Sequence, residues 1–314
     1  MPMRLIKRVF LLQVFCLSLP LCALSSLALG GGAEFPNPQP YPEVRYEHKT
    51  STEPAQQIYI ARIDLTDPDV DVRVASGGPD PDGAGEYQTT LQTPTTIAER
   101  EHFEVAVNGD FFSAQKTVDV EGAKSGFVPD KWAKAVGPAV TDGSLWAPAA
   151  EPRAALLLDA RKRARIALMK EVPQDAYQVI AGSNILVRDG AVSVESASGF
   201  SRTRHPRTAV GIEGDGKTLV LVVVDGRHAG QAAGMSLTEL ANLMSGLGCR
   251  DALNLDGGGS SEMVMRHPQD GQLQVLNTPS DGRERAVANV LGITIRGSRR
   301  TAQLRPPTPA PDKK

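Results

Sequence analysis

The most chemically specialised stretch of this 314-residue chain lies at residues 251–262, where an apolar run ends in a cluster of small and polar residues. The cluster contains one acid, three glycines and two serines: Asp256, Gly257, Gly258, Gly259, Ser260 and Ser261. Three successive glycines cost backbone entropy and pack nothing, so a folded protein keeps them where the backbone is unusual or another molecule comes close. Their N–H groups can form a concave nest for an anion. We interpret the stretch as a binding or catalytic site, with a glycine-tolerant turn as the alternative.

Three further segments share this design, in which an apolar strand borders a polar cluster. The clusters are Asn108 with Asp110 after residues 104–107, Asp225 with Arg227 after residues 219–224, and Arg207 before residues 209–212. A single strand that ends in Asp-Gly is usually only a turn. Four such clusters in one chain indicate a shared polar site. By contrast, His205 and His228 are equally well interpreted as solvated side chains.

The elements that hold these clusters are predicted to be mostly strands. Apolar and polar residues alternate over residues 57–64, 70–75, 154–159 and 165–168, which is typical of half-buried strands. Residues 208–212 and 219–224, on either side of a turn, and residues 287–295 are also predicted to be strands. Residues 179–194 are predicted to form a hairpin that turns at Arg188-Asp189-Gly190.

Two helices are predicted, a short one over residues 95–102 and a stronger one that starts at Ser236. Ser236 and Glu239 match the Ser-x-x-Glu capping box, and Gly248 is suited to end this helix. Residues 219–255 therefore read strand, loop, helix, strand, which predicts a locally parallel pair. The predicted fold class is α+β, a mostly antiparallel mixed sheet with a few packed helices and one βαβ crossover near residues 219–255.

This crossover has a consequence for the acids. Asp225 and Asp256 each follow the carboxyl end of a strand, so we expect them at the same edge of the sheet. Open α/β sheets bind ligands at that edge.

The N-terminal residues have the pattern of an export signal. Arg4, Lys7 and Arg8 precede a long uncharged run and a small-residue cleavage site, so residues 1–28 are expected to be a signal peptide. An uncleaved membrane anchor is the alternative. Cleavage would remove three bases and no acid, so the formal charge would change from −2 to −5. A negatively charged mature chain argues against nucleic acid as a partner. The signal peptide favours a periplasmic or extracellular location, with no membrane span left after cleavage.

Composition also sets the expected domain limits. Residues 29–54 are rich in proline and are predicted to be a linker, and residues 297–314 are predicted to be a disordered tail. One domain is expected over residues 55–296. Cys249 would be the single cysteine of the mature chain, so the fold is expected to hold without an intrachain disulfide.

Six motifs, in this order, resemble those of the phosphodiester glycosidase family. They are Asn108-Gly-Asp-Phe-Phe, Arg207-Thr-Ala-Val-Gly-Ile, Val224-Asp-Gly-Arg, Gly234-Met-Ser-Leu-Thr-Glu-Leu-Ala, Leu253-Asn-Leu-Asp-Gly-Gly-Gly-Ser-Ser and Asn277-Thr-Pro-Ser-Asp. The similarity spans about residues 55–296. It implies a compact α+β domain and a hydrolase that cleaves the glycosidic bond of a sugar-1-phosphodiester and releases a sugar and a phosphomonoester. The export signal adds the expectation that the substrate is a phosphodiester of an envelope or extracellular polysaccharide. The resemblance also implies site roles for Asn108, Arg207, Asp225, Arg227, Asp256, Gly257, Gly258, Gly259, Ser260, Ser261, Asn277 and Arg285.

The chemistry of such a substrate suggests how these residues divide their roles. The leaving phosphate monoester departs as a stable anion, so the site needs positive charge and N–H donors at the phosphate and a carboxylate near the anomeric carbon. Arg207 and Arg227 can bind two oxygens of the phosphate each. Asp256 and Asp225 are the candidate catalytic carboxylates, and Asp256 is favoured because the glycines leave room beside it.

Two other functions are compatible with the same clusters. One is a non-catalytic envelope or sugar-phosphate-binding module. The other is a metal-dependent phosphodiesterase in which Asp110, Asp225 and Asp256 bind a hard divalent cation. The favoured hydrolase requires no cofactor. The identity of the sugar, the stereochemical outcome and the oligomeric state are left open by the sequence.

Overall fold

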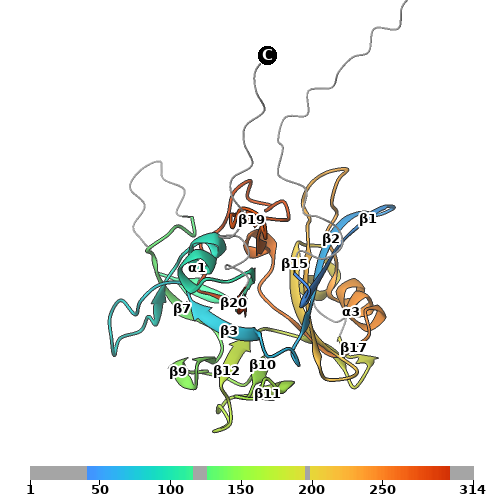
Figure 1. Ribbon diagram of the computed structural model, residues 1–314. Helices are drawn as coiled ribbons and strands as arrows, with labels where there is room; N and C mark the ends of the chain where they lie inside the picture. Colours follow the sequence, from blue (N-terminus) through green and yellow to red (C-terminus); the bar gives the residue numbers. More distant parts are fainter. Residues whose placement is uncertain (1–40, 116–125, 195–198, 298–314) are drawn as a thin grey trace, which may run out of the picture. The chain divides into compact units, whose positions relative to one another are not determined.

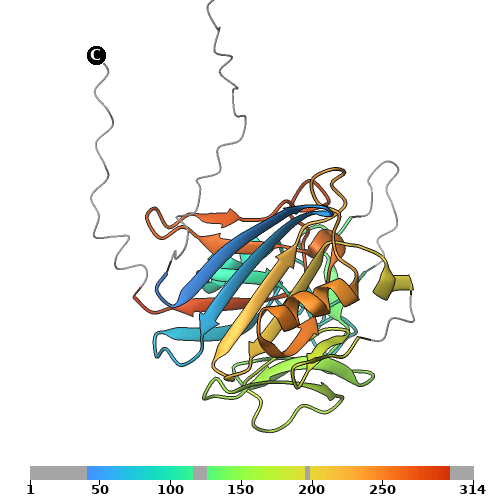
Figure 2. The ribbon, with the colours of Figure 1, turned by 90° about the vertical axis from the view of Figure 1, so that its right-hand side faces the viewer.

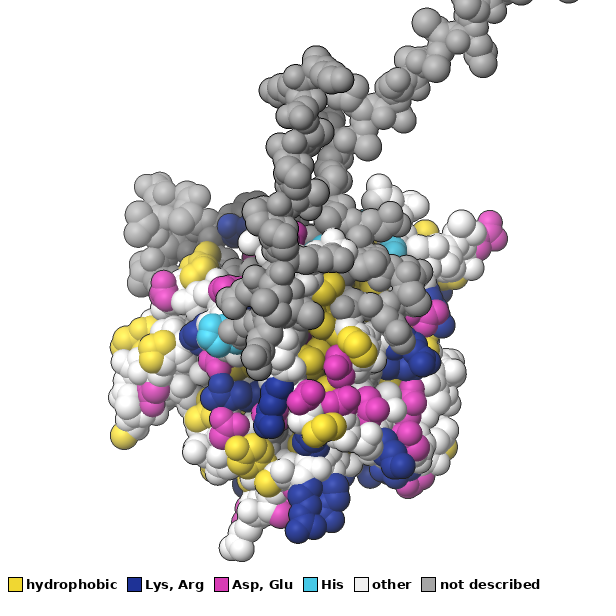
Figure 3. Space-filling view, viewed as in Figure 1, with side chains coloured by type: hydrophobic (Ala, Val, Ile, Leu, Met, Phe, Trp, Pro, Cys, Tyr) yellow, Lys and Arg dark blue, Asp and Glu magenta, His cyan; other side chains and the backbone are white. Residues whose placement is uncertain are grey.

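The computed structural model describes residues 41–115, 126–194 and 199–297, which form the ribbon coloured in Figure 1. The predicted signal peptide, residues 29–40 of the predicted linker and nearly all of the predicted tail lie outside these residues. No helix of the described ranges is long and apolar enough to cross a membrane. On the face shown in Figure 3, basic and acidic side chains are interspersed over the described surface.

The largest sheet has seven strands, and each neighbouring pair is antiparallel. In spatial order the strands are β1 (Val44–Thr52), β2 (Ala55–Asp64), β16 (Thr218–Val224), β15 (Arg207–Glu213), β17 (Cys249–Asn254), β13 (Ile185–Arg188) and β14 (Ala191–Val192).

Two five-stranded sheets and one three-stranded sheet complete the described fold. The first contains β19 (Leu273–Val275), β18 (Met263–Arg266), β5 (Val105–Asn108), β20 (Asn289–Ile295) and β3 (Val70–Ser76). The second contains β11 (Ala164–Met169), β10 (Arg153–Leu158), β12 (Gln178–Ala181), β8 (Ala139–Thr141) and β9 (Ser144–Ala147). The small sheet contains β4 (Thr89–Thr90), β7 (Trp132–Ala135) and β6 (Phe112–Ala114).

A shared hydrophobic core joins the seven-stranded sheet to the sheet that contains β5. It is built from side chains that point inward at every second position, such as Leu219, Leu221 and Val223 of β16 and Val105 and Val107 of β5. Burying this apolar surface is the main force that holds the two sheets together.

The helices α1 (Pro94–Glu101) and α3 (Leu237–Gly246) cover the outer faces of these two sheets (Figures 1 and 2). Ile97 of α1 belongs to a cluster on the outer face of the β5 sheet, and Leu240 of α3 packs with Val220 and Val222 of β16. A third helix, α2 (Gly199–Arg202), has only one turn. The two predicted helices, the Ser236 capping box and the predicted strands are confirmed.

The predicted parallel pair within residues 219–255 is wrong. The order strand, helix, strand is present, but β15 lies between β16 and β17 and is antiparallel to both. The two strands therefore run in the same direction without being neighbours. The prediction failed because the connection from β16 to β17 passes over β15. The sequence of residues 219–255 does not show that β15 pairs between these two strands.

The predicted linker is wrong from Val44 onward, because residues 44–52 form strand β1. Val44 and Tyr46 are buried against the core while the remaining side chains of β1 are half-buried or exposed. The prolines before this strand gave the segment the composition of a linker. The predicted hairpin is confirmed at its turn, where β13 pairs with β14, but β12 belongs to another sheet.

Removing the cap of α3 should destabilise the fold measurably. The Ser236 hydroxyl accepts a hydrogen bond from Glu239 N at 3.2 Å, and the Glu239 carboxylate accepts one from Ser236 N at 2.9 Å. We expect Ser236→Ala to lower the free energy of unfolding by about 1 kcal/mol, measured by urea denaturation. Asn242→Ala, at an exposed position of the same helix, should change it by less than about 0.5 kcal/mol. Equal effects of the two substitutions would show that the cap contributes nothing.

Candidate active site

Three of the four polar clusters predicted from the sequence lie at one edge of the seven-stranded sheet, and the fourth is at the end of β5 in another sheet. Arg207 begins β15, whereas Asp225 and Asp256 follow the ends of β16 and β17. Because β15 is antiparallel to both neighbours, its first residue lies at the edge where they end. The backbone N–H of Asp256 donates to Gly109 O at 2.9 Å, which ties this edge to the end of β5.

A pocket of about 340 Å³ opens at this edge, and we call it the arginine pocket. It contains three arginines, one histidine, one acid, two aromatic rings and the glycine run. Its lining residues are Phe111, Phe200, His205, Arg207, Arg227, Asp256, Gly257, Gly258, Gly259 and Arg285. The pocket therefore brings together seven residues that were predicted to belong to the site, with Arg285 predicted from the family resemblance alone. They are Arg207, Arg227, Asp256, Gly257, Gly258, Gly259 and Arg285.

Arg207 is buried in the pocket wall with 1% of its surface exposed. Its Nε donates to Met235 O at 2.9 Å, and its Nη2 donates to the carbonyls of Phe200 and Thr203 at 3.1 and 3.0 Å. Among the described residues it forms no ion pair with an acid. Burial, and secondly the charge of Arg227, lowers the pKa of Arg207 to about 10. An anion bound here would relieve this unfavourable burial of positive charge.

Arg227 is held in an unusual backbone conformation beside Arg207. Its φ is 64°, in the left-handed region that residues with a Cβ rarely adopt. Its Nη2 lies 3.3 Å from His205 Nδ1, and no ion pair of this arginine is found within the described ranges. Such a conformation costs free energy and is concentrated at functional sites. Here it directs a guanidinium toward the glycine run.

The third arginine, Arg285, is fixed by an acid and an aromatic ring. Its Nε and Nη2 donate to Asp281 Oδ2 at 2.9 and 2.7 Å, and its guanidinium lies 4.9 Å from the ring centre of Phe127. Because this charge is already paired, Arg285 contributes less free positive charge to the pocket than Arg207 and Arg227.

The glycines allow side chains and backbone to approach closely rather than forming a three-amide nest. Gly257 N donates to Asp256 Oδ1 and Gly258 N donates to Pro206 O, both at 2.9 Å. A Cβ at Gly258, whose φ is 64°, would lie 3.1 Å from Arg227 Nη2, and a Cβ at Gly259 would clash with the Arg285 guanidinium. Of the three amides, only that of Gly259 has no acceptor among the described residues.

Asp256 supplies the carboxyl group of the pocket. Burial raises its pKa to about 6, against the opposing effects of the Ser260 hydroxyl, the Gly257 N–H and Arg285. A carboxyl group with this pKa is ionised at neutral pH yet more basic than an ordinary aspartate. It can therefore act as a nucleophile or as a general base beside the arginines.

Several predicted site residues lie behind the pocket and position it. The fully buried Asn108 donates from Nδ2 to Asp256 O at 2.7 Å and accepts from Thr208 Oγ1 and Glu262 N at 2.6 and 3.1 Å. Asn277 donates to Ser261 O at 3.0 Å. Neither asparagine lines the arginine pocket, and neither do Ser260 and Ser261, which are 1% exposed.

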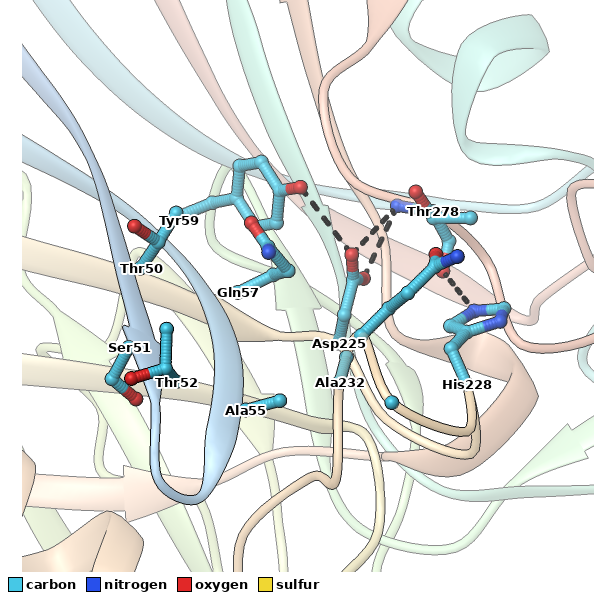
Figure 4. Close-up of a pocket in the computed structure, with 12 residues that line it drawn as sticks. Thr50, Ser51, Thr52, Ala55, Gln57, Tyr59, Asp225, His228, Ala232 and Thr278 are labelled. Carbon is cyan, nitrogen blue, oxygen red and sulfur yellow. Dashed lines mark hydrogen bonds between the residues drawn. The ribbon is translucent and has the colours of Figure 1, made fainter. Parts of the chain in front are cut away.

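Asp225 lies in a different pocket, so the structure does not bring the two candidate carboxylates into one cavity. Its oxygens accept hydrogen bonds from Tyr59 Oη at 3.3 Å and from Thr278 N at 3.0 and 3.1 Å (Figure 4). They also accept one from Asn277 Nδ2 at 2.9 Å. Burial raises its pKa, while the bonds from Asn277 and Thr278 oppose the rise. This second cavity, of about 550 Å³, is lined mainly by hydroxyl and amide side chains. With four internal hydrogen bonds, Asp225 fastens the end of β16 to the segment at residues 277–278.

The three-aspartate cation site does not form. No group of three or more His, Cys, Asp or Glu side chains suited to a metal ion occurs in the described ranges. Asp110 is 2% exposed, and its Oδ2 accepts from Gly137 N at 2.7 Å. Burial raises the pKa of Asp110 to about 7. Its side chain lines neither this pocket nor the one that contains Asp225.

Three lining residues were not identified by the sequence analysis: His205, Phe111 and Phe200. Phe111 belongs to the motif that begins at Asn108, and its place beside that motif was the available signal. Phe200 lies on α2 with its ring 4.6 Å from the Arg207 guanidinium carbon. His205 is only two residues before Arg207, but a single histidine in a polar segment gave no basis for choosing it.

Comparison with known proteins identifies the family of the chain. The model of a family described as phosphodiester glycosidase matches residues 101–294. An SPbeta prophage-derived uncharacterized protein of Bacillus subtilis (strain 168) is 40% identical over 91 residues, which are 29% of this chain. The matching segment covers only 13% of that protein.

Two solved structures share the fold. The zebrafish N-acetylglucosamine-1-phosphodiester alpha-N-acetylglucosaminidase catalytic domain, auto-inhibited by its pro-peptide, aligns with a TM-score of 0.58 at 22% identity, covering 81% of this chain and 82% of that one. A hypothetical protein from Synechocystis aligns with a TM-score of 0.59 at 15% identity over 81% of this chain and 62% of that one. At these identities the likeness establishes the fold alone.

Adding one methyl group at Gly259 should impair anion binding without unfolding the protein. The Cβ of Gly259→Ala would clash with the flexible ends of Arg285 and Asp281, so we expect those side chains to move and the backbone to stay. Since a charge-assisted hydrogen bond contributes about 1.5–3 kcal/mol, calorimetry should show phosphate binding weakened by about tenfold or more. The melting temperature should be nearly unchanged.

The matched control for this test is Gly246→Ala. Gly246 lies at the end of α3, and a Cβ there would meet no atom within 4 Å, so phosphate binding should be unaffected. Loss of stability in Gly259→Ala with binding intact would instead identify the glycine run as a plain turn.

Proposed function

We propose that this chain, which belongs to the phosphodiester glycosidase family, is an exported hydrolase that cleaves the glycosidic bond of a sugar-1-phosphodiester. The products are a free sugar and a phosphomonoester. The observation that carries the proposal is the combination, in one pocket, of Asp256 with Arg207 and Arg227, two arginines that form no ion pair among the described residues.

This pocket suits the substrate because it separates two chemical tasks. A phosphodiester carries one negative charge, which Arg207 and Arg227 can bind. The pocket offers the N–H of Gly259, which has no acceptor among the described residues, as a further donor. The sugar part of the substrate must then present its anomeric carbon to Asp256. The rings of Phe111 and Phe200 line the same cavity and suit the apolar face of a sugar ring.

The reaction needs only water and residues of the chain. The bond between the anomeric carbon and the bridging oxygen breaks, and its electron pair remains on the phosphate. Water supplies a hydroxyl group to the anomeric carbon and one proton to the solvent, and the phosphoryl charge changes from −1 to −2. Asp256 acts either as the nucleophile that forms a glycosyl–enzyme bond or as the base that deprotonates water.

A substrate screen tests this function directly. Sugar-1-phosphodiesters that differ in the sugar should be incubated with the purified protein and the products identified by mass spectrometry. Release of a free sugar together with a phosphomonoester supports the proposal. A binding module would release neither product, and a phosphodiesterase that cuts at phosphorus would release a sugar-1-phosphate.

Loss of turnover in a chelator would favour the metal-dependent alternative. Because the chain has the pattern of an exported protein, phosphodiesters of the cell envelope are the first substrates to test.

Replacing Asp256 should abolish turnover. Asp256→Asn is nearly isosteric but removes the charge, so we expect a loss in kcat on the order of 10⁴. Since burial raises the pKa of Asp256 to about 6 and the carboxylate is the active form, the wild-type rate should fall as the pH is lowered through about 6. Any residual rate of the variant should lack this acid limb.

The control variant is Asp251→Asn, which removes a carboxylate from β17, the strand that precedes Asp256. Asp251 accepts a hydrogen bond from Arg250 Nε at 2.8 Å and lies toward the opposite end of β17, so this variant should keep its turnover and its acid limb. A folded Asp256→Asn protein with near-wild-type turnover would show that Asp256 has only a structural role.

Arg227→Lys should impair catalysis although the charge is kept. Lysine lacks the planar fork that can bind two phosphate oxygens, so we expect kcat/KM for a sugar-1-phosphodiester to fall by about tenfold or more. The loss should be smaller for a neutral aryl glycoside of the same sugar. Arg204→Lys is the control, because Arg204 pairs with Glu239 outside the pocket. Equal losses on both substrates would show that Arg227 does not contact the phosphate.

A further inference from the structure

His205 lies in the arginine pocket with a defined tautomer. Its Nδ1 is 3.3 Å from Arg227 Nη2. A guanidinium group can only donate hydrogen bonds, so Nδ1 must be the acceptor and carries no proton. In the neutral imidazole the proton is then on Nε2. The ring therefore enters the site as an N–H donor and cannot accept a proton at Nε2.

The surroundings of the ring keep it neutral. The charged groups that share the pocket with it are Arg207 of β15, Arg227 of the loop after β16, Arg285 and Asp256. Burial, followed by the charges of Arg207 and Arg227, lowers the pKa of His205. A protonated ring would add a further positive charge beside these arginines, so the neutral Nε2–H form is the stable one at neutral pH.

The backbone and two neighbours fix the position of the ring. His205 N donates to Met235 O at 3.2 Å, and Met235 N donates to His205 O at 2.9 Å. Gly234, with a φ of 78°, allows this close contact, since a Cβ there would lie 2.5 Å from His205 O. The ring of Phe200 stacks on the imidazole with centroids 6.4 Å apart and an interplanar angle of 26°. The donor is thus held in place before any ligand binds.

We propose that His205 is a catalytic residue of the hydrolysis proposed above, whose Nε2–H donates a hydrogen bond to the departing phosphate. This inference rests on the proposed function. When the bond to the anomeric carbon breaks, its electron pair stays on the bridging oxygen and the phosphoryl charge changes from −1 to −2. A fixed donor binds this product-like charge more strongly than the substrate, so it accelerates the step. The imidazole keeps its proton throughout.

The test compares three substitutions of His205. The amide nitrogen of His205→Gln reaches about as far from the backbone as Nε2, whereas that of His205→Asn reaches only as far as Nδ1. We expect His205→Ala and His205→Asn to lower kcat for a sugar-1-phosphodiester by about 10²–10³ with little change in KM, as for the loss of one oxyanion donor. His205→Gln should recover most of the lost rate. For a neutral aryl glycoside of the same sugar, the four proteins should differ much less.

A second measurement does not depend on turnover. Calorimetry with inorganic phosphate should show weaker binding in His205→Ala and His205→Asn than in the wild type and in His205→Gln. His228→Ala is the matched control, because His228 lines the other pocket, where its Nε2 lies 3.1 Å from Thr278 O. It should bind phosphate as the wild type does. Melting temperatures of all variants establish that they are folded.

The outcomes separate this inference from the function on which it rests. If the wild type hydrolyses the substrate and His205→Ala retains its kcat, or if Gln is no better than Asn in rate and in phosphate binding, the role of His205 is disproved and the function stands. If the wild type hydrolyses no sugar-1-phosphodiester, the hydrolytic role of His205 falls together with the proposed function. In that case the phosphate titrations alone decide whether His205 binds the anion.

Discussion

The site depends on holding the positive charge of Arg207 inside the protein without an ion pair to any acid of the described residues. A buried charge is costly unless hydrogen bonds compensate it. Three backbone carbonyls, those of Met235, Phe200 and Thr203, accept from its guanidinium, and the Phe200 ring covers one face. These groups orient the guanidinium and offset part of its desolvation, but they carry no net charge. The remaining positive charge would favour the binding of an anion in this pocket.

Much of the surrounding architecture serves to bring other groups to this charge. The link between Asp256 N and Gly109 O and the contacts of Asn108 join the ends of β5 and β17. The glycines then let Arg227 and Arg285 approach the backbone that follows Asp256. The absence of side chains on these glycines thus leaves room for cations beside a carboxyl group. A side chain at those positions would keep the arginines away from the pocket, even though the fold could still form.

The strands, the capped helix and the gathering of polar clusters at one sheet edge were predictable from the sequence, because period-2 burial and capping are local properties. The order of the strands was not, since pairing across β15 is decided by contacts between distant segments. Likewise, β1 could not be recognised behind a run of prolines. His205 gave no signal, because its role follows from the Arg227 side chain, which is distant in sequence and adjacent in space.

The separation of Asp225 from Asp256 was, in contrast, encoded in the strand pattern. Along β16 the residues that face the shared core are Leu219, Leu221 and Val223, so Asp225 continues the core-facing series and meets Tyr59 on that side. Along β17 and directly after it, Leu253 and Leu255 face the shared core. Asp256 is one position further along the chain, so its side chain points to the opposite face. Two acids at the same edge of one sheet therefore point to opposite faces. Asp256 is therefore the one carboxyl group that lines this pocket among the described residues, and the pocket also contains the imidazole of His205. A second carboxylate there would repel an anion bound by the arginines, whereas a neutral imidazole supplies a donor without adding negative charge.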